Sequence, residues 1–208
     1  LSGRQGSLDI TAVNGTAWNV PYDTLFGRLC LDSNVVNLDS VAVGMPDSRF
    51  MAKGSFDYLA APMRLRLDTL HATFMEREFH NDGPMRIQID SLGFVFDTLS
   101  LANPRASFDA SGRFNYDQSM QLRFKLHRLP IGPWLRTFDQ DYPLNGFVSC
   151  DAQLEGSLEE PLFALSGRVD SLRYENLILG DLVAGISYQD TELNIDSIMV
   201  HSDSGSYR

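Results

Sequence analysis

ASFDASGRFNY, residues 106–116, places small or apolar side chains at every second position and polar side chains between them. Successive side chains of a β-strand point to opposite faces, so this spacing predicts one long strand with an apolar and a polar face. The same pattern occurs 58 residues earlier, in RFMAKGSFDY (49–58). A chain that repeats a one-sided strand builds an extended surface, which favours a carrier or scaffold over an enzyme.

The segments beside these two strands repeat as well. LDSVAV (38–43) matches FDTLSL (96–101), and MRLRL (63–67) matches MQLRF (120–124). A weaker match relates 19–43 to 176–200 and keeps the spacing of the apolar residues. Repeats of one supersecondary unit stack in one dimension and need not close. We therefore expect an open array of strands that belongs to a longer protein.

Nearly every segment is predicted to be a strand, and the short connections predict antiparallel neighbours. Turn-forming residues such as Asn14-Gly15, Asn81-Asp82-Gly83-Pro84 and Asn145-Gly146 separate the strands. The predicted strands are 8–13, 25–32, 35–43, 48–58, 63–70, 85–90, 94–101, 106–116, 120–127, 147–154, 162–170, 182–188 and 193–200.

One segment departs from this pattern. Ile131, Trp134, Leu135 and Phe138 follow the i, i+3, i+4, i+7 spacing of a short amphipathic helix, which Pro143 would end. Such a helix must rest its apolar side on the sheet or close the end of the sheet. The predicted division of the chain is β-repeats at 1–128, a helical insert at 129–142 and a further β-repeat at 143–208.

The composition excludes several classes of function. The net charge is −10, and an acidic surface repels phosphate backbones, so nucleic acid is not an expected partner. Most of the acidic residues follow the strand alternation and are interpreted as the solvated face. No stretch reaches the roughly 20 apolar residues that a membrane-spanning helix needs.

The residues that could carry catalysis or bind a metal form no recognised motif. The four histidines lack ligand spacing, and His71, Glu76, Glu78 and His80 are best interpreted as solvated strand positions. The sequence therefore indicates neither an enzyme nor a bound cofactor or metal.

The two cysteines are predicted to face in different directions. Cys30 faces opposite to its neighbours Leu29 and Leu31, whereas Cys150 shares a face with Val148 and Leu154. Because they belong to different repeats, we expect two unpaired thiols, with a disulfide as the alternative.

A sheet with one apolar face must cover that face. An open sheet of about fourteen strands is expected to curl, so we predict an elongated, curled antiparallel sheet that forms a U-shaped apolar groove for acyl chains. The residues expected to line this groove are Phe50, Phe56, Tyr58, Met63, Leu65, Leu67, Leu99, Leu101, Phe108, Phe114, Tyr116, Met120, Leu122, Phe124, Leu126, Val148, Leu154, Leu193 and Ile195.

The segment PLNGFVSCDAQLEGSLEEPLFALSGRV (143–169) resembles a motif of the AsmA-like superfamily, most closely of its TamB-like members. The matching positions are Gly146, Gly156, Pro161 and Gly167. The run that follows, to residue 200, is similar to the next element of that family, and the helix predicted before Pro143 also fits.

The resemblance implies a fold, a location and partners. TamB-like proteins fold as a U-shaped β-taco, lie in the periplasm of Gram-negative bacteria and are anchored in the inner membrane. They partner an outer-membrane barrel of the Omp85 type and support phospholipid transport and outer-membrane biogenesis. The expected ligand here is thus a phospholipid or another molecule with acyl chains.

A different function remains open from the residues alone. The same alternation would serve a structural or adhesive β-sandwich with a dry core and no ligand. An enzyme acting on carbohydrate is disfavoured, because the aromatic residues follow the apolar phase instead of lining an exposed cleft with carboxylates.

Overall fold

The computed structural model describes residues 5–17, 20–45, 48–74, 77–132, 135, 142–189, 191–202 and 205–207. Nearly all of them lie in antiparallel β-strands, so the predicted fold class is confirmed at that level. The chain divides into two compact units, Leu1–Asn103 and Pro104–Arg208. The predicted divisions at 128/129 and 142/143 depend on the expected helix and stay predictions.

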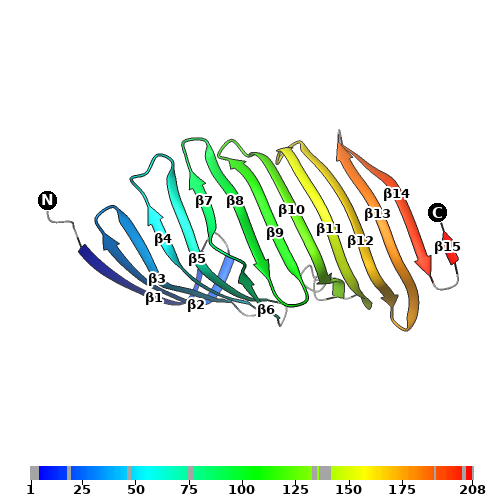
Figure 1. Cartoon of the computed structure of the whole chain (residues 1–208), viewed down its shortest axis with the longest axis horizontal. Coiled ribbons are helices and arrows are strands. Elements are labelled where there is room, and N and C mark those ends of the chain that lie inside the picture. The colour runs from blue at the N-terminus through cyan, green and yellow to red at the C-terminus, as the bar shows by residue number, and fades with distance from the viewer. Residues whose placement is uncertain are drawn as a thin grey trace. The chain divides into compact units, whose positions relative to one another are not determined.

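In the first unit, β1 to β5 pair with their neighbours in chain order, and Figure 1 shows them side by side. The strands described here are β1 (Gln5–Ala17), β2 (Val20–Asp32), β3 (Val35–Met45), β4 (Ser48–Asp57), β5 (Met63–Phe74), β6 (Arg77–Asn81), β7 (Met85–Ile89) and β8 (Gly93–Ala102).

Beside β5, the strands β6 and β7 share one position in the sheet. β6 pairs with the second half of β5 and β7 with its first half, and both pair with β8. Asn81 fills the gap between them: its Oδ1 accepts the Leu70 N–H at 2.7 Å, and its Nδ2 donates to the carbonyls of Asp68 and Gly83. The turn predicted at 81–84 thus interrupts a strand instead of reversing the chain.

The second unit is a simple meander in which each strand pairs with the next (Figure 1). Its described strands are β9 (Ser107–Asn115), β10 (Ser119–Pro130), β11 (Leu144–Ser157), β12 (Pro161–Tyr174), β13 (Leu177–Gln189), β14 (Glu192–Ser202) and β15 (Gly205–Tyr207).

Each predicted strand coincides with an observed one, and β6 and β15 were not predicted. Many observed strands are longer than predicted; β5, for example, reaches Phe74 and β12 reaches Tyr174. In the predicted helix, Trp134 and Phe138 lie outside the described residues, so that helix stays a prediction.

A four-residue pattern marks five irregular points in these strands. Apolar-Asp-Ser/Thr-apolar coincides with a register shift at Leu38–Val41, Leu67–Leu70, Phe96–Leu99, Val169–Leu172 and Ile195–Ile198, where the strand holds one more residue than its partner. The same pattern also occurs in a regular part of β2 (Tyr22–Leu25) and in the turn before β8 (Ile89–Leu92). An extra residue of this kind is a β-bulge, which bends the strand and increases its twist. The long strands accordingly curve along their length (Figure 1).

The bulges keep the apolar residues on one face. Leu38 and Val41 are three positions apart, so an uninterrupted strand would place them on opposite faces. With the bulge between them, Leu38 pairs with Gly54 and Val41 with Ala52, two positions apart on β4. Both side chains therefore point to the same side, and the bulge offsets the odd spacing.

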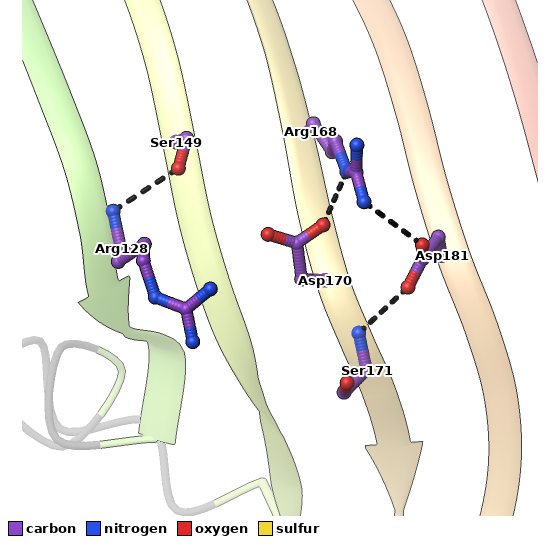
Figure 2. Close-up of polar contacts among 6 residues, drawn as sticks. All are labelled: Arg128, Ser149, Arg168, Asp170, Ser171 and Asp181. Atoms are coloured by element: carbon purple, nitrogen blue, oxygen red, sulfur yellow. Dashed lines mark hydrogen bonds and ion pairs between the residues drawn. The ribbon is translucent and has the colours of Figure 1, made fainter.

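Neighbouring strands hold the bulges in place in the second unit (Figure 2). Ser171 has a positive φ of 55°, and its N–H donates to Asp181 Oδ1 at 2.9 Å. The other oxygen of Asp181 accepts from Arg168 Nη2 at 3.0 Å. On β10, Arg128 has a φ of 52° and its N–H donates to Ser149 Oγ at 3.0 Å. Side chains thus bond amides that the shifted ladder leaves unpaired.

Removing the Asp181 carboxylate should destabilise this unit. We expect Asp181→Ala to lower the free energy of unfolding by about 1 kcal/mol, because the Ser171 amide loses its acceptor and Arg168 keeps only Asp170 among its described partners. Asp151→Ala is the matched control, since among the described residues Asp151 forms one long, exposed pair, with Lys125 at 3.9 Å. Its effect should stay within about 0.5 kcal/mol. Urea denaturation measures both, and equal losses would contradict the assigned role.

Gly54 and Gly112, equivalent positions of the 58-residue repeat, have one physical role. A Cβ at Gly54 would collide with the carbonyl oxygen of Arg66, and a Cβ at Gly112 with that of Gln121. Gly112 also has a φ of 130°, which strongly favours glycine. The glycines of the alternating pattern therefore allow close approach of adjacent backbones.

Substitution of Gly112 should be costly. We expect Gly112→Ala to lower the free energy of unfolding by at least about 2 kcal/mol, from the collision and the unfavourable φ. Gly6→Ala is the control, because no heavy atom lies within 4 Å of the added Cβ. Its effect should lie within about 1 kcal/mol of zero. Thermal or chemical denaturation distinguishes the two, and a tolerated Gly112→Ala would disprove the close approach.

Candidate functional site

The candidate site is a continuous apolar surface on one side of the sheet in each unit. We call it the apolar face and define it by the rows of register partners given below. Residues directly opposite each other in an antiparallel pair point to the same side, so the register identifies its members. In the first unit the rows of register partners are Leu31–Val36–Phe56–Leu65–Ile87–Phe96, Leu8–Leu29–Leu38–Gly54–Leu67–Met85 and Ala12–Leu25–Val43–Phe50–Ala72–Phe79.

The apolar face of the second unit is built in the same way. Its rows are Gly112–Leu122–Leu154–Phe163–Tyr188–Leu193, Ala110–Phe124–Ala152–Leu165–Ile186–Ile195, Phe108–Leu126–Cys150–Gly167–Ala184–Ile198 and Leu129–Val148–Val169–Leu182–Val200. Phe108 and Phe124 stack with their ring centroids 6.2 Å apart. Each row is thus apolar across at least five adjacent strands.

Most of the residues predicted to line a groove lie on these two faces. Tyr58 and Tyr116 are the exceptions, because they follow the ends of β4 and β9 and are 38% and 57% exposed. The backbone reverses there: the Asp57 carboxylate accepts the amides of Leu59 and Ala60, and the Gln118 N–H donates to the Asn115 carbonyl. The alternation therefore ends one residue earlier than predicted.

The apolar faces are only partly covered. Their side chains are mostly half-buried, and full burial is confined in the described residues to a few, including Phe79 at 2% and Leu129 at 3% exposure. Leu193 and Ile195 are 65% and 58% exposed. Side chains inside a closed core are instead buried and touch many neighbours.

The accessible surface area supports the same conclusion. The chain exposes 14043 Å². A compact monomer of this mass exposes roughly 9,700 Å², and two compact domains of half the mass expose roughly 11,700 Å² together. Even two separate compact domains would therefore expose less surface than this chain does.

The opposite face of each unit is polar. Along β10, Gln121, Arg123, Lys125 and His127 are exposed, whereas the alternate residues are not. On β9 the polar side chains are half-buried instead, because Ser111 lies opposite the longer Arg123. Ion pairs on this face, such as Arg28–Asp9 at 2.9 Å, are exposed and contribute little to stability.

Sequence reasoning missed several members of the apolar face. Val36, Ile87, Phe96 and Phe163 align with predicted residues only through the register. Phe79 was missed because β6 was not predicted. The recurring apolar-Asp-Ser/Thr-apolar pattern is a partial signal for the register shifts, because it marks five of them but also occurs at Tyr22–Leu25 and Ile89–Leu92, where no shift is present.

The cysteines lie on the predicted faces and are both free thiols. Cys30 lies on the polar face, where its Sγ donates to Asp39 Oδ2 at 3.1 Å. This hydrogen bond and then burial raise the pKa of the Cys30 thiol. Cys150 lies in the apolar rows, and burial raises the pKa of its thiol. Both groups are therefore less nucleophilic than an ordinary cysteine at neutral pH.

The residues considered for metal binding do not come together in the described structure. Within the described ranges, His, Cys, Asp and Glu form no group of three that could hold a metal ion. His71 and His80 lie opposite each other on exposed strand positions, and Glu76 lies outside the described residues. Among the described residues, no helix is both long and apolar enough to cross a bilayer.

No family model, curated protein or solved structure matches the chain.

The contact between Cys30 and Asp39 predicts a selective change in thiol reactivity. Asp39→Ala removes the acceptor that stabilises the protonated thiol, so the pKa of Cys30 should fall and more thiolate should be present at a given pH. We expect faster alkylation of Cys30 by iodoacetamide at pH about 8, measured by peptide mass spectrometry. Cys150 is the internal control, and its rate should not change.

Proposed function

We propose that the apolar faces bind the acyl chains of lipids. Unbroken rows of Leu, Ile, Val and Phe that remain half-exposed support this proposal, because fully solvated apolar surface of this extent is unfavourable. The described residues contain no buried polar side chain that would select a polar ligand by hydrogen bonding. A hydrocarbon chain matches such a surface.

The same surface favours movement of the ligand over tight storage. Apolar burial contributes roughly 25 cal/mol per Å² and has no directional requirement. A chain lying across equivalent rows gains similar free energy at each position, so no single position holds it. We therefore propose conduction of acyl chains along a U-shaped groove, to which the bends at the bulges would contribute.

The proposed setting follows from the resemblance of 143–169 to the TamB-like proteins. We propose that the chain is a non-catalytic segment of a periplasmic protein of that type, anchored in the inner membrane and acting in phospholipid transport and outer-membrane biogenesis. An Omp85-type barrel is the proposed partner of the whole protein. The geometry of the motif supports a structural role for its glycines: Gly156 has a φ of 89° beside the β11–β12 turn, and a Cβ at Gly146 would lie 3.0 Å from Val169.

A charge placed in the apolar rows should abolish binding of acyl chains. Leu154 lies between Leu122 and Phe163, and we expect Leu154→Asp to weaken binding of a fluorescent fatty acid by at least about tenfold, because the carboxylate must be desolvated. Gln153→Asp is the matched control. Gln153 is exposed on the polar face opposite Arg123, so the same charge should be tolerated there.

Native mass spectrometry after gentle purification provides the second measurement. We expect phospholipid to accompany the wild-type chain and Gln153→Asp, and to be lost from Leu154→Asp. Circular dichroism of each variant checks that the sheet is intact. A folded wild-type chain that carries no lipid and binds no fatty acid would favour the ligand-free structural or adhesive β-sandwich repeat.

A further inference from the structure

The polar face of the first unit has a hollow in which cationic side chains gather. It has a volume of about 470 Å³ and is lined from β3, β4, β5, β7 and β8. Its charged and hydroxyl-bearing residues are Ser55, Asp57, Arg64, Arg66, Arg86 and Asp97. Three guanidinium groups thus gather at one place on a chain whose net charge is −10.

The register brings two of the arginines into direct opposition. Arg66 on β5 pairs with Arg86 on β7, and Arg64 lies two positions from Arg66 on the same face. Side chains directly opposite have Cβ atoms about 5 Å apart, and like charges at this spacing destabilise a sheet. An arrangement of this kind is unfavourable unless an anion lies between the charges.

Among the described residues, ion pairing engages one of the three arginines. Arg66 Nε donates to Asp68 Oδ1 at 2.7 Å. The Asp57 carboxylate accepts instead from the amides of its own turn. In the part of the chain that the structure describes, neither Arg64 nor Arg86 forms an ion pair.

We propose that this hollow binds a phosphate group through Arg64, Arg66 and Arg86. A guanidinium group presents paired N–H donors that match phosphate oxygens. Phosphate carries enough oxygens to accept from three guanidinium groups at once, whereas a carboxylate has only two. The group could belong to free phosphate or to a lipid headgroup. The three arginines lie on the face opposite the apolar rows, although Leu65 and Ile87 of one row also border the hollow, so the phosphate contacts are distinct from the proposed acyl-chain contacts.

The first test measures the thermal stability of the full chain with increasing inorganic phosphate against chloride of equal ionic strength. We expect phosphate to raise the melting temperature of the wild type and not that of Arg86→Gln. Without phosphate at low salt, Arg86→Gln should melt above the wild type, because the opposed charges are gone. Arg123→Gln is the control, since Arg123 faces Ser111 and Gln153 on the polar face of the second unit. It should respond to phosphate as the wild type does.

The second test distinguishes the two sources. Flotation with vesicles of phosphatidylcholine alone is compared with vesicles that also contain phosphatidic acid. Retention only by the second kind, reduced about tenfold in affinity by Arg86→Gln, indicates a headgroup. A response to inorganic phosphate without retention indicates free phosphate. Equal responses of wild type and Arg86→Gln in both tests, or no response in either, would overturn the proposal while leaving acyl-chain binding untouched.

Discussion

The long strands have to bend while their apolar side chains stay on one face, and the rest of the structure depends on how this is achieved. In a regular strand the side of a residue depends only on whether its position is odd or even. The five Asp-centred bulges each add one residue, and the apolar residues on either side are spaced by three to match. The rows of the apolar face depend on this match between bulge and spacing. So do the hydrogen bonds that Asp181 accepts beside the bulge of β12.

An apolar face that is largely half-exposed is an uncommon arrangement for an antiparallel sheet. Antiparallel sheets normally pack one face against a core. Here the stability of each unit rests on its hydrogen-bonded ladder, on close approach at glycines such as Gly112, and on contacts between neighbours in the same row, such as Phe108 with Phe124. Ion pairs on the polar face add little, since their side chains remain solvated.

The strands and faces could be predicted from the sequence because period-two alternation is a local property. The alternation of β5 and β10 was evident from MRLRL and MQLRF alone. Some predicted strands ended near a bulge, since an odd spacing looks like the end of the alternation: β5 was expected to end at Leu70 and continues to Phe74. Others, such as the strand predicted at 35–43, ran through the bulge.

The rows and the arginine cluster were beyond sequence reasoning. Whether Arg66 meets Arg86 depends on which residues of β5 and β7 align, and that alignment depends on an interruption at 82–84 that resembles an ordinary turn. The short strand β6 was missed for the same reason, and with it Phe79. The alternation of apolar and polar residues can be found within one strand, whereas the register depends on how two strands align.

The bulges have a consequence for how such a chain can vary in length. Deleting the aspartate from Leu67-Asp68-Thr69-Leu70 would leave Leu-Thr-Leu, an ordinary alternating stretch with both leucines still on one side. The strand would lose the bend at the bulge, and its apolar side chains would stay on one face. Curvature and amphipathicity are therefore encoded separately in this chain. Single-residue deletions or insertions at these aspartates could change the curvature of a related sheet without moving its apolar residues to the opposite face.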